Sequence, residues 1–136
     1  MASDRIWGNP KRVRVLLDTN ALFMIFEQNI RIEDELQRLL GSFDICIIQQ
    51  IYDELIFLQQ KGNGKQQKLA KTALSFIKRY PLIEGIQKES VDASLLHTAI
   101  DLSAIVVTND VELRKKLMRT GLQTIFLRGK NHLMLE

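Results

Sequence analysis

Two carboxylates stand just after short apolar runs in this sequence. Asp18 follows the run VRVLL at 13–17, and Asp110 comes shortly after the run AIVV at 104–107. An aspartate in such a place can cap the next helix, because its side chain accepts a hydrogen bond from a free backbone N–H. It can also bind a ligand, because open parallel sheets bind ligands outside the carboxyl ends of their strands. For either residue alone, capping is the simpler interpretation.

Two more carboxylates occupy helical positions on faces expected to pack inward. Glu54 lies three residues after Ile51 and four before Leu58, which places it inside the apolar stripe of its helix. Asp92 precedes Leu95 by three residues on another helix. Asp92 also lies in a first helical turn, where a negative charge is favourable in its own right. Glu54 lies mid-helix and lacks that explanation, so the acids are better interpreted as a set.

Acids gathered at one end of a sheet raise one another's pKa unless a positive charge lies among them. No Lys, Arg or His has a helical position that would supply this charge. The two histidines, His97 and His132, lie away from the acids, so a zinc site is not expected. A set of oxygen donors suits Mg²⁺ or Mn²⁺, as one ion or as a pair about 4 Å apart. Such a site can bind a phosphodiester and activate water.

The apolar runs alternate with helical patterns along the chain. Strands are predicted at 13–17, 45–48, 82–86, 104–107 and 124–127, in the order β-α-α-β-α-α-β-α-β-α-β. Continuously apolar strands of this kind favour a parallel sheet that helices cover on both faces, a three-layer α/β/α fold.

A length of 136 residues, 46% of them hydrophobic, suits one domain. We assign it to residues 11–136 and expect flexibility in residues 1–10 and in the glycine-containing segment 61–65.

Composition limits the classes of protein further. The net charge of +3 identifies no partner, but residues 61–79 hold six bases and no acid, and residues 111–136 hold six bases against two acids. These segments are either solvated helix faces or a footprint for a polyanion. The single cysteine, Cys46, lies in an apolar run and is expected to be a buried, inert thiol. No apolar run approaches the roughly 20 residues of a membrane span, so a soluble, cytoplasmic protein is expected.

The four acids in their sequence contexts resemble the pattern of the PIN-domain nucleases. The resemblance extends from about Val13 to Leu133, and the segment from Ile125 onward also looks like the archaeal branch related to ribosomal-RNA-processing PIN proteins. Relatives in that branch often carry two adjacent acids where this chain has Asp92-Ala93, which bears on the number of metal ions. The matching motifs are Asp18-Thr19-Asn20, Tyr52-Asp53-Glu54-Leu55, Val91-Asp92-Ala93-Ser94-Leu95 and Thr108-Asn109-Asp110.

The resemblance implies a Rossmann-like domain with a five-stranded parallel sheet and metal-dependent endoribonuclease activity. Carried over residue by residue, it implies that Asp18, Asp92 and Asp110 hold one or two Mg²⁺ or Mn²⁺ ions. Glu54 would bind through water or a second ion, and Asn20 and Thr108 would orient the carboxylates or contact a phosphate oxygen. The RNA backbone would lie on the basic segments, whose candidate residues are Lys65, Lys68, Lys71, Arg114 and Lys115.

Two other classes of function compete with a nuclease. A PIN-like scaffold could bind RNA or a protein without cutting anything. A nucleotide-binding α/β domain would need a phosphate loop, but Gly62-Asn63-Gly64-Lys65 follows a helix instead of a strand. The implied partners of the nuclease are RNA, a second copy of the chain, and either an antitoxin or a ribosome-assembly factor. A toxin and a housekeeping RNA-processing enzyme both remain open.

Overall fold

Short apolar stretches pair into a six-stranded sheet in the computed structural model, which describes residues 12–129 and 131–136. The strand order is β3-β2-β1-β4-β5-β6, and all pairs are parallel except β5 with β6. The strands are β1 (Val13–Leu17), β2 (Phe43–Ile48), β3 (Leu82–Ile83), β4 (Ile105–Val107), β5 (Thr124–Arg128) and β6 (His132–Leu135).

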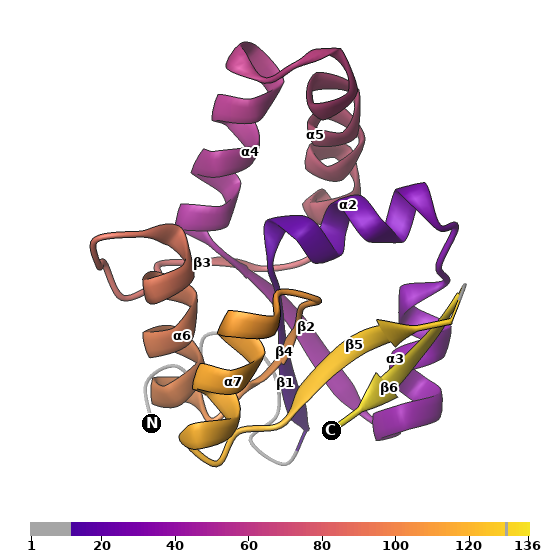
Figure 1. Cartoon of the computed structure of the whole chain (residues 1–136), viewed down its shortest axis with the longest axis vertical. Helices are drawn as coiled ribbons and strands as arrows, with labels where there is room; N and C mark the ends of the chain where they lie inside the picture. The colour runs from indigo at the N-terminus through magenta and orange to yellow at the C-terminus, as the bar shows by residue number, and fades with distance from the viewer. Residues whose placement is uncertain (1–11, 130) are drawn as a thin grey trace.

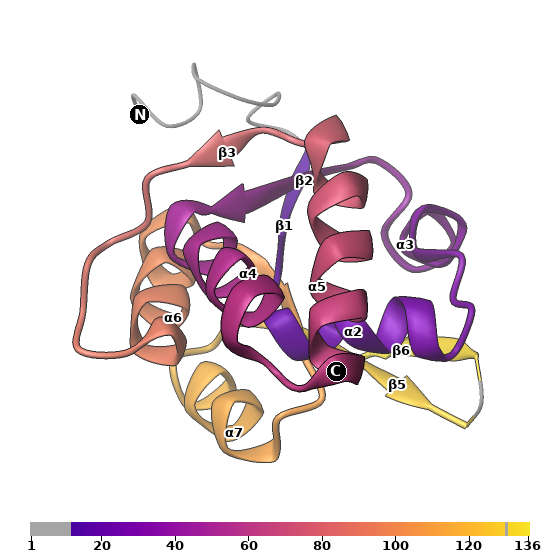
Figure 2. The ribbon, with the colours of Figure 1, turned by 90° about the horizontal axis from the view of Figure 1, so that it is seen from above.

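Helices cover both faces of this sheet. Figure 2 shows α6 and α7 on one side of the strands and α3 on the other, while α4 and α5 form a hairpin that stands at the top of Figure 1. The predicted three-layer α/β/α fold is therefore confirmed. The helices are α2 (Thr19–Glu27), α3 (Ile32–Leu40), α4 (Gln49–Lys61), α5 (Gly64–Phe76), α6 (Val91–Leu102) and α7 (Val111–Arg119), with a short 3₁₀ turn η1 (Ile77–Arg79).

The strand order explains where a site can form. From β1 the chain adds β2 and β3 on one side and then crosses to place β4 on the other side, so the order reverses between β1 and β4. Leu17 is in register with Val107, which brings the residues after both strands together. The Asp18 N–H donates to the Val107 carbonyl at 3.4 Å, one step beyond the last strand pair. Ligand sites of open parallel sheets lie at such a reversal.

The sixth strand and the length of the third differ from the prediction. The sequence predicts five parallel strands, but His132–Leu135 adds an antiparallel strand at the edge of the sheet. The Leu133 side chain of this strand is buried. Met134 is exposed, so the segment alternates as a half-covered edge strand does. The predicted strand at 82–86 is only two residues long, because Gly85 turns away to exchange hydrogen bonds with the Gln50 side chain.

The segment at 61–65 is not the flexible loop that its glycines predict. Helix α4 continues to Lys61 and α5 begins at Gly64, so only two residues connect them. Asn63 caps α5 through a reciprocal pair of hydrogen bonds with Gln66: the Gln66 N–H donates to Asn63 Oδ1 at 2.8 Å, and the Asn63 N–H donates to Gln66 Oε1 at 2.9 Å. The connection is a closed, capped turn. The other segment predicted to be flexible, residues 1–10, lies outside the described residues.

The core lies between the sheet and its helices, and its centre is apolar. Leu16, Cys46 and Val106 are fully buried on three neighbouring strands. Burial raises the pKa of the Cys46 thiol well above its usual range, so the thiol stays protonated, as predicted. In the described part of the chain, no helix combines the length and apolar character that crossing a bilayer requires.

Residues of α3 fasten the edge strand β6 to the domain. The Leu133 N–H donates to Glu35 Oε1 at 2.8 Å, and Arg38 Nη2 donates to the Leu133 carbonyl at 2.8 Å. The hydrogen bond from Arg38, helped by the Leu133 N–H, lowers the pKa of Glu35 to about 2. Because this pKa is below that of the unfolded chain, Glu35 contributes stability above about pH 4.5 and loses it as the pH falls toward 2.

We therefore expect Glu35→Gln to lower the free energy of unfolding by about 1 kcal/mol at neutral pH. The difference in unfolding free energy between parent and variant should shrink as the pH falls. Protonation of Glu35 then removes the charge from the parent, and the variant has no charge at this position at any pH. Urea unfolding at several pH values measures this. Asp34→Asn, which removes the same charge from an exposed neighbour, is the control, and an equal loss in both variants would contradict the role of β6.

Candidate active site

Asp18 is the most buried acid of the predicted set. It is the N-cap of α2, and its Oδ1 accepts from the Ala21 N–H at 2.6 Å, so the capping interpretation is confirmed. Its Oδ2 accepts from the Thr108 hydroxyl. The side chain is nevertheless costly to ionise. Burial, with smaller effects from the charges of Asp92 and Asp110, raises the pKa of Asp18 to about 6 although both hydrogen bonds lower it.

Thr108 links the two acids that follow neighbouring strands. It is fully buried, its hydroxyl donates to Asp18, and the same oxygen accepts from the Asp110 N–H at 3.1 Å. The Asp110 side chain caps α7 by accepting from the Leu113 N–H at 3.2 Å. Thr108 therefore contacts the Asp18 carboxylate, and its role in orienting that carboxylate stays a prediction. Asn20, predicted for the same role, is exposed beside the acids, and no hydrogen bond joins it to a carboxylate among the described residues.

Glu54 faces inward from α4, as its place in the apolar stripe predicts. It is partly buried and accepts from the hydroxyl of Thr19, the first residue of α2. Asp53 faces solvent, where it accepts from Gln49 at 2.9 Å. Thr19 was not among the predicted site residues. The sequence did contain a signal for Thr19. A threonine next to Asp18 in the first turn of a helix has a hydroxyl that can donate to a carboxylate of another element.

Asp92 differs from the prediction, because it lies exposed at the rim instead of packing inward. The partial loss of water around its carboxylate, followed by the charge of Asp110, raises its pKa. Lys116 of α7 lowers that pKa, so the expectation that no cation lies near the acids is also wrong. The sequence could not reveal this pair, because Lys116 is carried to Asp92 by the packing of α7 against α6.

Three of the four acids line one pocket. Its volume is about 320 Å³, near the lower end for ligand sites. Asp110 is coupled to this pocket through its charge and through Thr108 instead of lining it. The pocket lies where β1 ends, beneath the α4–α5 hairpin, and Figure 1 shows α2, α4 and α6 meeting there. The lining residues are Asp18, Thr19, Asn20, Phe23, Ile51, Glu54, Leu58, Gln66 and Asp92.

The chemistry of the donor set fits a hard divalent cation. The available ligands are carboxylate, hydroxyl and amide oxygens. The charges of Asp92 and Asp110 raise the pKa of Asp18, and the charge of Asp110 raises the pKa of Asp92, effects that a cation would reverse. The spacing is not that of a preformed chelate. Among the residues that the structure describes, no three Asp, Glu, His or Cys side chains lie close enough to hold one ion. Binding would therefore require these side chains to turn toward the ion.

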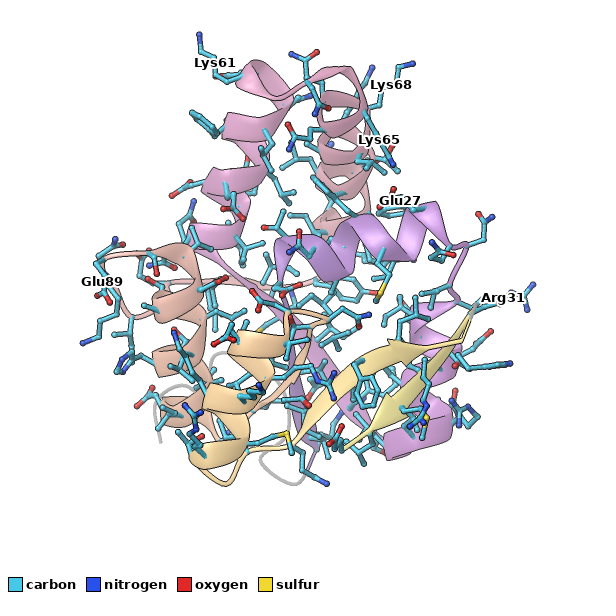
Figure 3. The ribbon with its side chains drawn as sticks, in the orientation of Figure 1. Glu27, Arg31, Lys61, Lys65, Lys68 and Glu89 are labelled. Carbon is cyan, nitrogen blue, oxygen red and sulfur yellow. The ribbon has the colours of Figure 1, made fainter. Side chains whose placement is uncertain are left out.

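The predicted RNA-binding bases do not form one surface. Lys65 and Lys68 project from the α4–α5 hairpin in Figure 3, and Lys65 pairs with Glu27 at 2.6 Å. Lys71 lines a different pocket, between α4, α5 and β3. Arg114 is also used elsewhere: its guanidinium lies 3.7 Å from the centre of the Phe126 ring and pairs with Glu136 at 2.6 Å. Arg114 is therefore removed from the predicted surface, whereas Lys115 is exposed on α7.

Comparison with protein families agrees with this arrangement. A family model described as "PIN like domain" matches residues 15–130. The chain belongs to the PIN-like domain family. The matched residues run from within β1 to just beyond β5, a range that contains all four acids of the PIN pattern.

Two curated relatives cover almost the same length as this PIN domain. Ribonuclease VapC4 of Methanocaldococcus jannaschii is 31% identical over 122 residues, which is 88% of this chain and 93% of the relative. Ribonuclease VapC9 of Archaeoglobus fulgidus is 27% identical over 136 residues, which is 100% of this chain and 98% of the relative. The similarity therefore extends over the whole domain instead of one motif.

Solved structures show the same fold at lower identity. The PIN domain endonuclease Utp24 has a TM-score of 0.72 at 18% identity and covers 90% of each chain. A VapBC2 complex from Rickettsia felis, bound to a DNA fragment from its promoter, has a TM-score of 0.63 at 19% identity and covers 85% of this chain and 100% of that one.

Proposed function

We propose that this PIN domain, residues 11–136, is a metal-dependent endoribonuclease that hydrolyses RNA phosphodiester bonds. The observation that carries the proposal is the convergence of Asp18, Glu54 and Asp92 on one pocket at the reversal of strand order, with Asp110 coupled to them by charge. The ribonuclease names of the two curated relatives support the choice of RNA. The donor chemistry supports Mg²⁺ or Mn²⁺.

In this proposal Asp18, Asp92 and Asp110 hold one or two cations, and Glu54 orients the attacking water. A divalent ion, when bound, supplies charge neutralisation at the phosphodiester and lowers the pKa of water. Thr108 holds the Asp18 carboxylate in place, and Thr19 does the same for Glu54. Asn20, exposed at the pocket, contacts a phosphate oxygen. Lys65, Lys68 and Lys115 hold the RNA backbone without reading its sequence.

The direct test compares cleavage with and without metal. Purified protein is incubated with structured and unstructured RNA in Mg²⁺, in Mn²⁺ or in EDTA, and the products are resolved on a denaturing gel. We expect cleavage with either metal and none in EDTA, restored when excess metal is added back. Cleavage that survives EDTA would rule out the proposed mechanism.

Thr108→Val tests whether Thr108 positions Asp18. The change keeps the shape of the side chain and removes the hydroxyl, so we expect cleavage to fall by about 10- to 100-fold. Because the Thr108 hydrogen bond lowers the pKa of Asp18, its loss should also move the acid limb of the pH–rate profile to higher pH. Thr108→Ser keeps the hydroxyl and should restore both rate and profile. A slower Thr108→Val enzyme with an unchanged profile would indicate a purely structural role.

The second candidate is a PIN-like scaffold that binds RNA or protein without cutting it. One observation favours it: among the described residues, the acids do not stand at chelating distance. The two proposals differ in metal binding. A nuclease site should gain thermal stability when Mn²⁺ is added, through Asp18 and Asp110, whereas a silent scaffold should not respond.

The names of the relatives support two of the proposed roles. The VapC relatives and the VapBC2 complex support an antitoxin as a protein partner. The likeness to the PIN domain endonuclease Utp24 supports an RNA-processing role as the alternative. The proposal also includes a cytoplasmic location and a homodimer. Phe57 on α4 and Val111 on α7 are 61% and 55% exposed, and a second copy of the chain would cover such apolar side chains.

A further inference from the structure

The pocket that holds the acids has a second group of lining residues with different chemistry. Phe23 of α2 and Leu58 of α4 are partly buried apolar side chains, and Gln66 of α5 adds an amide. None of these three can bind a divalent cation strongly or supply a charge. The roles proposed for the acids leave this part of the pocket unexplained, although a chain of RNA that places its phosphate at Asp18 must place a neighbouring nucleotide nearby.

The orientation of the Gln66 amide follows from its hydrogen bonds. The Asn63 N–H can only donate, so the Gln66 atom that it meets at 2.9 Å must be the carbonyl oxygen. The amide nitrogen, with two hydrogens to donate, makes no hydrogen bond to any residue in the described part of the chain. Gln66 therefore brings a donor that is free for a ligand to a pocket that is otherwise rich in acceptors.

The turn before α5 holds this amide in place. A Cβ atom at Gly62 would lie 2.8 Å from Gln66 Cβ and 3.0 Å from Gln66 Oε1, so the side chain packs directly on the bare glycine backbone. Together with the reciprocal Asn63–Gln66 hydrogen bonds, this contact limits the rotamers that Gln66 can adopt. The donor is thus preorganised, which reduces the entropy lost when a ligand binds.

We propose that Phe23, Leu58 and Gln66 form a nucleobase subsite for an unpaired RNA nucleotide next to the scissile phosphate. The inference rests on the proposed function. The base stacks on the Phe23 ring against Leu58, because proteins bind unpaired bases on aromatic side chains. The Gln66 amide nitrogen donates to an acceptor on the edge of that base, a carbonyl oxygen or a ring nitrogen, so the subsite binds an unpaired base without selecting which one.

The lack of selection among bases has a specific reason. A glutamine that reads adenine accepts from its amino group while donating to its ring nitrogen, which uses both ends of the amide. Here the amide oxygen already accepts from the Asn63 N–H, so the donor end is presented to the base. Every base has a carbonyl oxygen or a ring nitrogen that accepts from such a donor. A neutral hydrogen bond of this kind corresponds to about a three- to tenfold gain in affinity.

Cleavage of a single-stranded RNA, compared with cleavage of the same RNA carrying one abasic nucleotide, tests the subsite. An abasic nucleotide at the position beside the cut should slow cleavage by the parent about tenfold, because the stacked base is then missing. Gln66→Glu keeps the acceptor for the Asn63 N–H but removes the donor, and it should slow cleavage of the intact RNA about three- to tenfold. Gln66→Met, which adds no charge, should show the same loss and should leave cleavage of the abasic RNA unchanged. Gln60→Glu places an equal charge on the same hairpin outside the pocket and should keep the parental rates.

A binding assay tests the subsite independently of cleavage. Fluorescence anisotropy, measured in EDTA, compares a labelled U hexamer with an abasic oligomer of the same length. The parent should bind the U hexamer more tightly, and Gln66→Met should reduce the difference. Phe23→Leu should weaken binding of the U hexamer by about tenfold, because it removes the stacking surface. A parent that treats intact and abasic RNA alike in both assays overturns the subsite while leaving the nuclease intact. Base-dependent binding without metal-dependent cleavage would overturn the nuclease and keep the subsite.

Discussion

Asp18→Asn is expected to reduce metal-dependent RNA cleavage by roughly a thousandfold, on the scale seen when one preorganised group of an active site is lost. Asparagine keeps an oxygen that can accept from the Ala21 N–H, so the cap of α2 should survive. What disappears is the charge of the most buried of the four acids. Gel assays of cleavage, with circular dichroism to confirm the fold, measure both consequences.

The same substitution should stabilise the metal-free protein. The pKa of Asp18 is raised from 3.8 to about 6, so the folded state binds its proton more tightly than the unfolded chain does. The penalty for ionising Asp18 is absent below about pH 4, grows between pH 4 and pH 6, and reaches about 3 kcal/mol above that range. Asparagine has no group to ionise, so Asp18→Asn removes this penalty.

We therefore expect a higher melting temperature for Asp18→Asn than for the parent at pH 7 in EDTA, with the difference shrinking toward pH 4. Thermal unfolding across this range measures it. Asp53→Asn, at a solvent-facing acid of α4, is the control and should change neither cleavage nor the pH dependence. If Asp18→Asn cut RNA as fast as the parent, Asp18 would have no place in the site.

Gly62→Ala should cause the largest loss of stability among single methyl additions to the α4–α5 turn. The new Cβ would lie 2.6 Å from the Leu58 carbonyl oxygen and 2.8 Å from Gln66 Cβ, so the backbone of α4 or the capped turn must move. Overpacking of this kind typically costs 1–3 kcal/mol, and we expect about 2 kcal/mol with a melting temperature roughly 8 °C lower. Urea and thermal unfolding report the loss.

Gly64→Ala is the matched control, two residues away in the same turn. A Cβ at Gly64 meets no atom within 4 Å, and Gly64 is the first residue of α5, where alanine favours the helix. Its stability should equal or slightly exceed that of the parent. Equal losses of stability in both variants would contradict this prediction. They would show that a side chain at either position disrupts the turn, and that the close contacts at Gly62 are not the cause.

The elements of the fold were predictable because their signals are local. The apolar runs at 13–17 and 104–107 correspond to β1 and β4, and helical spacing placed α4 and the inward face that carries Glu54. The errors also have local causes. Glycines at 62 and 64 predicted a loop, although Asn63 followed three residues later by Gln66 was the signature of a capping box. Alternation in His132–Leu135 could have predicted β6.

Within the site, the sequence by itself determined which acids stand at strand ends and on inward faces, since both depend on residues a few positions away. Only the tertiary structure decided their partners. The Thr108 hydroxyl reaches Asp18 across 90 positions, and Thr19 reaches Glu54 across 35. Lys116 near Asp92, and Arg114 turned toward Phe126, follow from helix packing and the edge of the sheet. Periodicity fixes the direction in which a side chain points, whereas its partner depends on which other element folds against it.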